Sequence, residues 1–194
     1  RIDTVKHVER GFWHYFGFYI RQRLHFKGKT NFFMFGEAFD GRDTLVGSYT
    51  KNGTEDPNIP IDDEAGAEGT CEHATEYEVG TNDKLNGDQL DSVFYFPQQF
   101  QVIRDVFRYR GPTSNIERLY LDRANNYGNL GAKRGPMDAA GTPISPQKLL
   151  VNFLDNHDVS RYLSPVDGCY TGADDARRKL HSALSILLTE DGIP

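Results

Sequence analysis

The sequence predicts an α/β domain built on a parallel sheet that closes into part of a barrel. Short apolar runs alternate along the chain with stretches whose apolar residues recur at helical spacing. Such alternation is typical of right-handed βαβ units and a parallel sheet. Several runs end abruptly in acidic residues, and in a barrel of parallel strands the carboxyl ends carry the active site. An open doubly wound sheet is the alternative, but the sequence contains neither G-x-G-x-x-G nor a P-loop.

The composition is that of a globular chain, and its mild acidity suits an uncharged substrate. Of the 194 residues, 38% are hydrophobic, and the formal net charge is −6. This mild acidity argues against a nucleic acid or an anionic membrane as partner. No apolar run in the sequence reaches the length of a membrane-spanning helix. Because the chain opens on Arg1 without a lead-in and stops directly after a helical pattern, we expect both ends to be cut from a longer protein.

Helices and strands are predicted from periodicity and from dense apolar runs. Gly28 is expected to end the first helix, because glycine readily adopts the left-handed conformation of a helix terminus. A polar loop at about 40–91 interrupts the pattern, and loops of that length are often functional. The predicted elements are helix 8–26, strand 31–35, strand 92–96 closed by Pro97, helix 100–107, helix 116–124, strand 149–154 and helix 176–188, flanked by the end of one strand and the start of another.

Three carboxylates, Asp3, Glu37 and Asp158, each follow an apolar strand or its remnant. Folding of these strands into one barrel would bring the three side chains to the same mouth. Glycoside hydrolysis uses such a set, because one carboxylate attacks the anomeric carbon and a second protonates the leaving oxygen. A third can stabilise the positive, oxocarbenium-like transition state. Arg1 lies on the same strand face as Asp3 and is expected to keep Asp3 ionised by lowering its pKa.

A metal-dependent hydrolase is the rival interpretation, since Asp and His at strand ends also bind metals. It normally needs more clustered histidines than His7 and His157 provide. Serine hydrolase chemistry has no support, because the sequence lacks a G-x-S-x-G motif. The acidic run 62–64 lacks the spacing of a calcium loop and is better explained as a solvated loop.

Three stretches resemble motifs of the α-amylase family of glycoside hydrolases. Residues 1–8 (RIDTVKHV) resemble its nucleophile motif, residues 35–38 (FGEA) its acid/base motif, and residues 153–158 (FLDNHD) its third catalytic motif. They occur in the family's order and span nearly the whole chain. The resemblance implies the C-terminal half of a TIM (β/α)8 barrel, from the end of the fourth strand to the start of the eighth. Residues 1–194 would then be a partial catalytic domain, with the long polar insertion after the fifth strand.

The resemblance also implies a role for each residue that matches a motif. Asp3 would be the nucleophile, and Glu37 the general acid and later the general base. Asp158 would stabilise the transition state by gripping sugar hydroxyls, and His157 would donate to a neighbouring hydroxyl. Arg1 would orient Asp3.

Further matches concern the leaving-group side and bound ions. Lys6 and His7 resemble the pair that contacts glucose on that side. The backbone carbonyl of His7 resembles a ligand of the family's structural calcium, whose other ligands would lie outside these residues. Arg1 and Asn156 match two of the three halide ligands of chloride-dependent members, so dependence on chloride stays open.

The resemblance implies a secreted, calcium-dependent α-amylase, a retaining enzyme that cleaves internal α-1,4-glucosidic bonds of starch- or glycogen-type glucans. A cyclodextrin-forming or other α-glucan transglycosylase of the same family is the alternative, because the motif 154–158 suits both. A non-catalytic carbohydrate-binding or partner subunit is the alternative of another class, against which the intact Asp3, Glu37 and Asp158 argue. Residues 1–194 alone are expected to be inactive, because half of the barrel mouth is missing.

Overall fold

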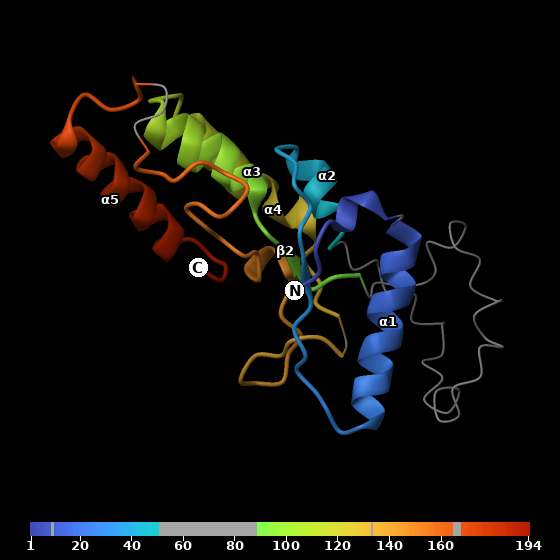
Figure 1. The fold of residues 1–194 in the computed structure, drawn as a ribbon. Helices are drawn as coiled ribbons and strands as arrows, with labels where there is room; N and C mark the ends of the chain where they lie inside the picture. Colours follow the sequence, from blue (N-terminus) through green and yellow to red (C-terminus); the bar gives the residue numbers. More distant parts are fainter. Residues whose placement is uncertain (9, 51–88, 133, 165–167) are drawn as a thin grey trace.

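The computed structural model of the chain describes residues 1–8, 10–50, 89–132, 134–164 and 168–194 (Figure 1). Most of the predicted polar insertion lies outside these residues, as does the acidic run 62–64. The elements of the described part are η1 (Val5–His7), α1 (Arg10–Phe26), β1 (Phe35–Gly36), α2 (Asp43–Gly47), β2 (Ser92–Val93), α3 (Phe96–Gln98), η3 (Gln99–Arg108), α4 (Ser114–Tyr127), η4 (Pro146–Lys148) and α5 (Ala173–Thr189).

The sheet is parallel and follows the order of the sequence. β1 and β2 pair in parallel, with Phe35 opposite Ser92. Single parallel bridges extend this pair on both sides, from Ile2 to β1 and from the end of β2 through Val151 to Ile193. Since neighbouring parallel segments need crossover connections, the helices α1, η3 with α4, and α5 lie between them in sequence. Closure of such a sheet into a barrel, and hence the half-barrel, stays a prediction.

The strands are shorter than the apolar runs predicted. The run 92–96 contributes only Ser92–Val93 to the sheet, and Pro97 stands in the first turn of α3 instead of after a strand. Proline suits this place, because its fixed φ matches a helix and its missing N–H has no intrahelical partner there. Asn31 has a φ of +60° and lies before β1 rather than in it. The run 149–154 pairs only through Val151.

The helices agree more closely with the predicted ranges. α1 ends at Phe26, and Gly28 follows with a φ of +65°. The backbone N–H of Gly28 donates to the His25 carbonyl, which closes the helix as predicted. Predicted helix 116–124 lies within α4, and predicted helix 176–188 lies within α5. The segment 100–107 is helical, but η3 is a π-helix, which the sequence pattern did not indicate.

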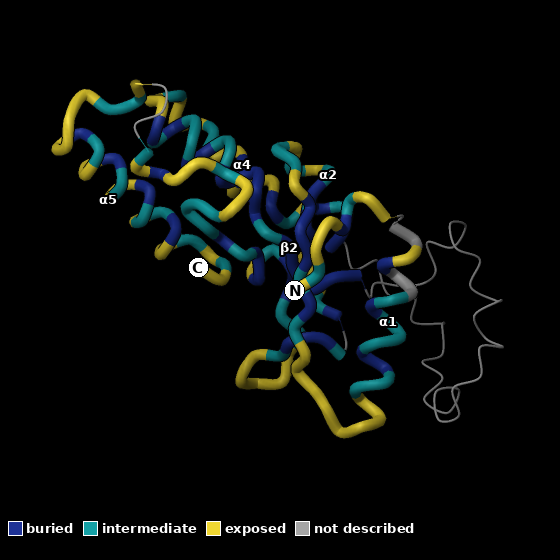
Figure 2. The backbone as a smooth tube through the Cα atoms, viewed as in Figure 1, coloured by how far each residue is buried: buried dark blue, intermediate teal, exposed yellow. Residues whose placement is uncertain are grey.

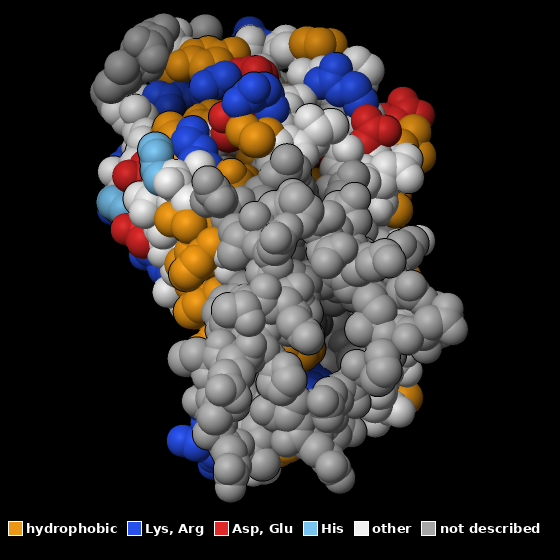
Figure 3. Space-filling view, turned by 90° about the vertical axis from the view of Figure 1, so that its right-hand side faces the viewer, with side chains coloured by type: hydrophobic (Ala, Val, Ile, Leu, Met, Phe, Trp, Pro, Cys, Tyr) orange, Lys and Arg blue, Asp and Glu red, His pale blue; other side chains and the backbone are white. Residues whose placement is uncertain are grey.

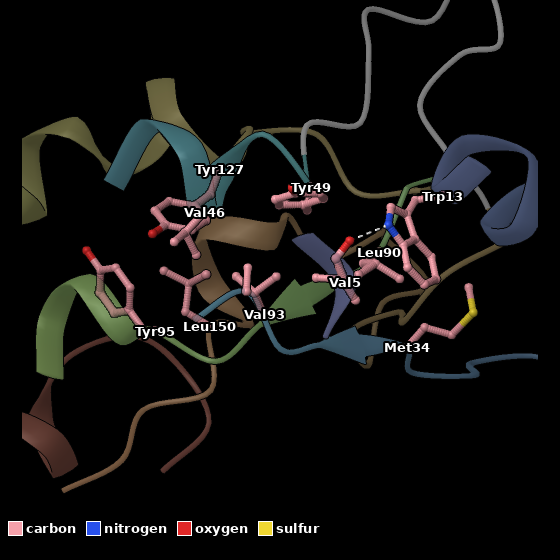
Figure 4. Close-up of a cluster of buried hydrophobic side chains, with 11 residues drawn as sticks. Val5, Trp13, Met34, Val46, Tyr49, Leu90, Val93, Tyr95, Tyr127 and Leu150 are labelled. Carbon is pink, nitrogen blue, oxygen red and sulfur yellow. Dashed lines mark hydrogen bonds between the residues drawn. The ribbon is translucent and has the colours of Figure 1, made fainter. Parts of the chain in front are cut away.

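The main core lies between α1, the paired strand segments, α2 and α4 (Figure 4). Its contacts tie the first residues of the chain to α1, because the Trp13 indole N–H donates to the carbonyl of the fully buried Val5 at 2.9 Å. Tyr95 and Tyr127 close the far side with their rings edge to face at 5.4 Å. The buried core residues are Val5, Trp13, Met34, Ala38, Val46, Tyr49, Leu90, Val93, Tyr95, Tyr127 and Leu150.

A smaller cluster joins η3 to α5 through Ile103, Ala183 and Tyr162. Burial is concentrated around β2 and the segments beside it, whereas the turn from α1 to β1 is exposed (Figure 2). On the described part of the face drawn in Figure 3, acidic and basic side chains are intermixed. None of the helices in the described part is both long and apolar enough to span a membrane.

Candidate functional site

The structure places the three predicted carboxylates at the carboxyl ends of parallel-paired segments. Asp3 directly follows Ile2, and Glu37 directly follows β1. The Glu37 N–H donates to the Ile2 carbonyl at 2.9 Å, and the Val5 N–H donates to the Glu37 carbonyl at 2.8 Å. These backbone bonds fix Asp3 beside Glu37. Asp158 reaches the same edge from the segment that follows Val151.

Arg1 bridges the first two carboxylates. One guanidinium nitrogen of Arg1, Nη2, donates to Oε2 of Glu37 at 3.0 Å and to Oδ1 of Asp3 at 3.3 Å. The guanidinium carbon lies 5.4 Å from the centre of the Phe94 ring, which holds the cation over the end of β2. Arg1 was predicted to orient Asp3, and the structure shows a shorter bond to Glu37.

Glu37 differs from its partners in burial. Its side chain is 9% exposed, whereas the side chain of Asp3 is 68% exposed. Burial raises the pKa of Glu37, and the hydrogen bond and negative charge of Asp3 raise it further, as does the charge of Asp158. The hydrogen bond from Arg1 lowers this pKa but does not outweigh the other influences. Glu37 therefore retains its proton to a higher pH than an ordinary glutamate, as a general acid requires.

Asp158 and His157 form the third side of the site. His157 Nε2 lies 3.2 Å from Asp158 Oδ2, and both residues have a ligand-type atom within 4.8 Å of a Glu37 carboxyl oxygen. Asn156 holds the loop, because its side-chain oxygen accepts the backbone N–H groups of Asp158 at 2.8 Å and Val159 at 3.2 Å. The oxygen of Asn156 thus acts in shaping the loop, and its predicted role toward a halide is untested.

Lys6 and His7 lie farther along the same edge. Lys6 donates to the Phe39 carbonyl and lies 3.6 Å from Asp40, so it contacts the segment just after Glu37. The adjacent Arg42 binds Asp40 and lowers its pKa to about 2. His7 is the last residue of η1 and is exposed. Its carbonyl would supply one of the six to eight oxygens that calcium takes, so the described residues alone do not make a calcium site.

The structure thus brings Arg1, Asp3, Glu37, His157 and Asp158 together, and places Lys6 beside them. Sequence reasoning missed Phe94, on which Arg1 lies. Its position was open to inference, because it is the first residue after β2 in the same sheet.

The cluster of Glu37, His157 and Asp158 also has the residue types of a metal site. A metal ligand must be deprotonated, and the raised pKa of Glu37 opposes this. A carboxyl group with a raised pKa beside other carboxyl groups has the environment of a proton donor.

Comparison with known proteins relates the chain to amylases. It is 27% identical over 194 residues, 100% of this chain, to the Beta/alpha-amylase of Paenibacillus polymyxa, of which the match covers 11%. It is 36% identical over 69 residues, 34% of this chain, to the Alpha-amylase of Streptomyces lividans, of which the match covers 8%. No family model matches the chain, and no solved structure matches it. The chain spans only about a tenth of these relatives, and its similarity to them indicates an amylase-related protein.

Proposed function

We propose that the protein carrying this chain is a retaining glycoside hydrolase that cleaves internal α-1,4-glucosidic bonds of starch- or glycogen-type glucans. The observation that carries the proposal is that the Asp3 and Glu37 carboxyl groups both accept a hydrogen bond from one nitrogen of Arg1, at 3.3 and 3.0 Å, which holds the two groups close together. Retaining enzymes hold their two carboxyl groups at about 5–5.5 Å, whereas inverting enzymes need roughly 6.5–9.5 Å to admit a water between them. The closeness of Asp3 and Glu37 favours retention.

In the proposed first step, the Asp3 carboxylate attacks the anomeric carbon while Glu37 gives its proton to the glycosidic oxygen. The bond between that carbon and oxygen breaks, the shortened glucan leaves as an alcohol, and the sugar remains as an ester on Asp3. In the second step Glu37, now a carboxylate, takes a proton from water, whose oxygen attacks the anomeric carbon and displaces Asp3. Two inversions give net retention.

The other residues of the site support these steps. Asp158 and His157 would hold hydroxyl groups of the sugar whose bond is broken, and the negative charge of Asp158 would stabilise its positive transition state. Arg1 would hold Asp3 in line for attack. Lys6 and His7 would contact glucose on the leaving-group side.

The choice of α-glucan rests on the names of the two amylases and on the motifs around Asp3, Glu37 and Asp158. We further propose that these residues belong to the C-terminal half of a (β/α)8 barrel. The sequence order of the parallel segments supports this proposal. We also propose secretion, and a structural calcium that includes the His7 carbonyl. Calcium would be supported if chelation lowers the melting temperature of the full-length protein, because an ion that binds only the native state stabilises it.

The test of the proposed function is the configuration of the first product. The full-length protein is incubated with maltoheptaose, and the anomeric protons of the new reducing ends are followed by NMR before mutarotation. We expect the α-anomer to form first. Initial β-anomer would contradict retention, and cyclic or lengthened glucans in place of new reducing ends would favour the transglycosylase. Binding without any turnover would favour the non-catalytic subunit.

A metal-dependent hydrolase is the second candidate, favoured by the proximity of Glu37, His157 and Asp158. It predicts that Zn²⁺ or Mn²⁺ binds with one-to-one stoichiometry in calorimetry and that Asp158→Asn abolishes the binding. We expect no such binding, because the raised pKa of Glu37 opposes the loss of the proton that metal binding requires. Activity that requires the added transition metal would overturn the glycosidase proposal.

A further inference from the structure

The motif 153–158 contains another acidic residue, Asp155, which the proposed steps do not use. Its side chain is 18% exposed, and both of its carboxylate oxygens are bound within the chain. Oδ1 accepts a hydrogen bond from Nη1 of Arg161 at 2.6 Å, and Oδ2 accepts the backbone N–H of Tyr162 at 2.9 Å. With both oxygens engaged, Asp155 is not placed to attack a substrate or to transfer a proton. Its role therefore lies in the structure of the loop that follows it.

The bond from the Tyr162 N–H to Asp155 closes this loop at its base. It joins two residues seven positions apart and leaves residues 156–161 as the loop between them. Both stems are anchored in the smaller core cluster, because Tyr162 is only 2% exposed and Leu154 packs against the same cluster, which includes Ile103 of η3. Asp155 thus ties the loop to a fixed part of the fold.

The closed loop carries two groups that the proposed mechanism needs beside Glu37. His157 and Asp158 each have an atom within 4.8 Å of a Glu37 carboxyl oxygen. Asn156 shapes the turn from inside, since its side-chain oxygen accepts the backbone N–H groups of Asp158 and of the next residue. These bonds span at most three positions, so they fix the turn but not its place relative to the core. The carboxylate at the base of the loop supplies that second constraint.

We propose that Asp155 is a positioning residue, which holds Asp158 and His157 at the site by closing the loop against the core. The proposal rests on the proposed function and goes beyond it by assigning roles to Asp155 and Arg161. The carboxylate makes a charge-assisted hydrogen bond with the Tyr162 N–H, which is the stronger constraint. Arg161 is 78% exposed and orients the carboxylate, a smaller contribution because ion pairs near the surface are weak.

The first measurement follows the loop itself and needs no activity. Amide hydrogen exchange, read by mass spectrometry, compares Asp155→Asn with the unsubstituted full-length protein. The NH₂ group of the asparagine would face a donor where the carboxylate offers an acceptor. We expect the peptide 156–162 to exchange about tenfold faster, because a hydrogen bond to a charged group is commonly worth the 1.4 kcal/mol of that factor. Peptides from α1 should exchange as before.

The second measurement asks whether Asp155 acts through Asp158. On maltoheptaose, Asp155→Asn should lower kcat by roughly 10- to 100-fold, since a misplacement of about 1 Å can cost about 10²-fold in rate. In a protein that already carries Asp158→Asn, the same substitution should lower kcat by only about 3-fold, the part that acts through His157. A loss of folded protein alone would lower kcat by the same factor in both.

A matched control and a rescue accompany these variants. Asp138 also accepts two backbone N–H groups in a loop, those of Ala140 at 2.9 Å and Thr142 at 2.8 Å, and it is not among the residues of the site. Asp138→Asn should leave kcat and the exchange of 156–162 unchanged. Arg161→Met should lower kcat by about 3-fold, as expected for a pair near the surface, and Arg161→Lys, which keeps the charge, should restore it.

Unchanged exchange of 156–162 in Asp155→Asn would overturn the inference, and so would equal losses of kcat with and without Asp158→Asn. If Asp155→Asn does not fold, the Arg161 variants decide, and an unchanged kcat in Arg161→Met would overturn the inference. If the unsubstituted protein hydrolyses no glucan, the proposed function fails, whereas faster exchange in Asp155→Asn would still support closure of the loop by this residue.

Discussion

Two arginine–aspartate pairs lie at opposite ends of the paired strands and differ in almost every physical respect. Arg21 binds Asp91 at 2.6 Å at the amino ends of β1 and β2, with side chains 0% and 1% exposed. Asp91 also accepts the Met34 N–H at 2.7 Å. Arg1 binds Asp3 at 3.3 Å at the carboxyl ends, where both side chains are largely exposed and Glu37 shares the same cation.

From this difference we infer that the pair at the amino ends serves the stability of the fold and that the groups at the carboxyl ends serve the proposed chemistry. At the amino ends, Arg21 and Asp91 neutralise each other's charge in the interior of the protein. At the carboxyl ends, three carboxyl groups lie close together, and burial of Glu37 together with the charges of Asp3 and Asp158 raises its pKa. Folding therefore favours the protonated form of Glu37. Protonated Glu37 stabilises the folded state at low pH, and this contribution is lost as the pH rises through the raised pKa of Glu37. Ligands of α/β sheets bind outside the carboxyl ends of the strands. The crowded carboxyl groups at this end are the ones that the proposed catalysis uses.

The largest expected effect comes from removing the proposed acid or the proposed nucleophile in the full-length protein. Glu37→Gln should lower kcat on starch by about 10²–10⁴-fold, the usual contribution of a general acid. Activity on a glucosyl fluoride, whose leaving group needs no proton, should survive far better. Asp3→Asn should lose both activities together. Identical behaviour of the two variants on both substrates would show that their roles are assigned wrongly.

The next largest effect should appear at the opposite end of the strands. Asp91→Asn leaves the Arg21 guanidinium buried without its counter-charge and should lower the free energy of unfolding by about 3–5 kcal/mol. Asp3→Asn should change it by only about 0.5 kcal/mol, because that side chain is exposed and its pair is near the surface. Urea unfolding of the full-length variants measures both. Equal losses of unfolding free energy in Asp91→Asn and Asp3→Asn would mean that both ends of the strands contribute alike to stability, contrary to this account.

The smallest effect is a shift in the pH profile. The Arg1 hydrogen bond lowers the pKa of Glu37, so Arg1→Met should raise it further. A general acid works while protonated, and the alkaline limb of kcat/KM should therefore move to higher pH. Arg42→Met is the matched control, because Arg42 pairs with Asp40 and is not among the groups that shift the pKa of Glu37. A shift to lower pH in Arg1→Met would contradict the electrostatic account.

The sequence predicted those parts of the site that follow from local patterns of apolar and acidic residues. Asp3 and Glu37 directly follow apolar residues, and parallel pairing places the ends of neighbouring segments on one edge, so their meeting followed from the pattern. Helix α1 was predictable because apolar residues recur through it and Gly28 can take its φ of +65°.

Other features depend on tertiary contacts that no local pattern carries. The 3.6-residue period does not distinguish the π-helix η3 from an α-helix, and a run of apolar residues does not show how few of them pair in a sheet. The hydrogen bond from Arg1 to Glu37 joins two residues that are 36 positions apart in the sequence. The groove lined by Phe39, Tyr109 and Asp158 is equally non-local, since these three side chains meet only in the folded chain.

The central claim is that Asp3 attacks the anomeric carbon while Glu37 supplies the proton. The most direct measurement is mass spectrometry of the full-length protein after reaction with a fluorinated α-glucosyl fluoride that forms its glycosyl ester faster than water removes it. We expect the peptide that contains Asp3 to gain the mass of one fluorinated sugar, and Asp3→Asn to prevent the gain. A sugar attached to Glu37 or Asp158, or no covalent adduct while the protein still hydrolyses starch, would contradict the claim.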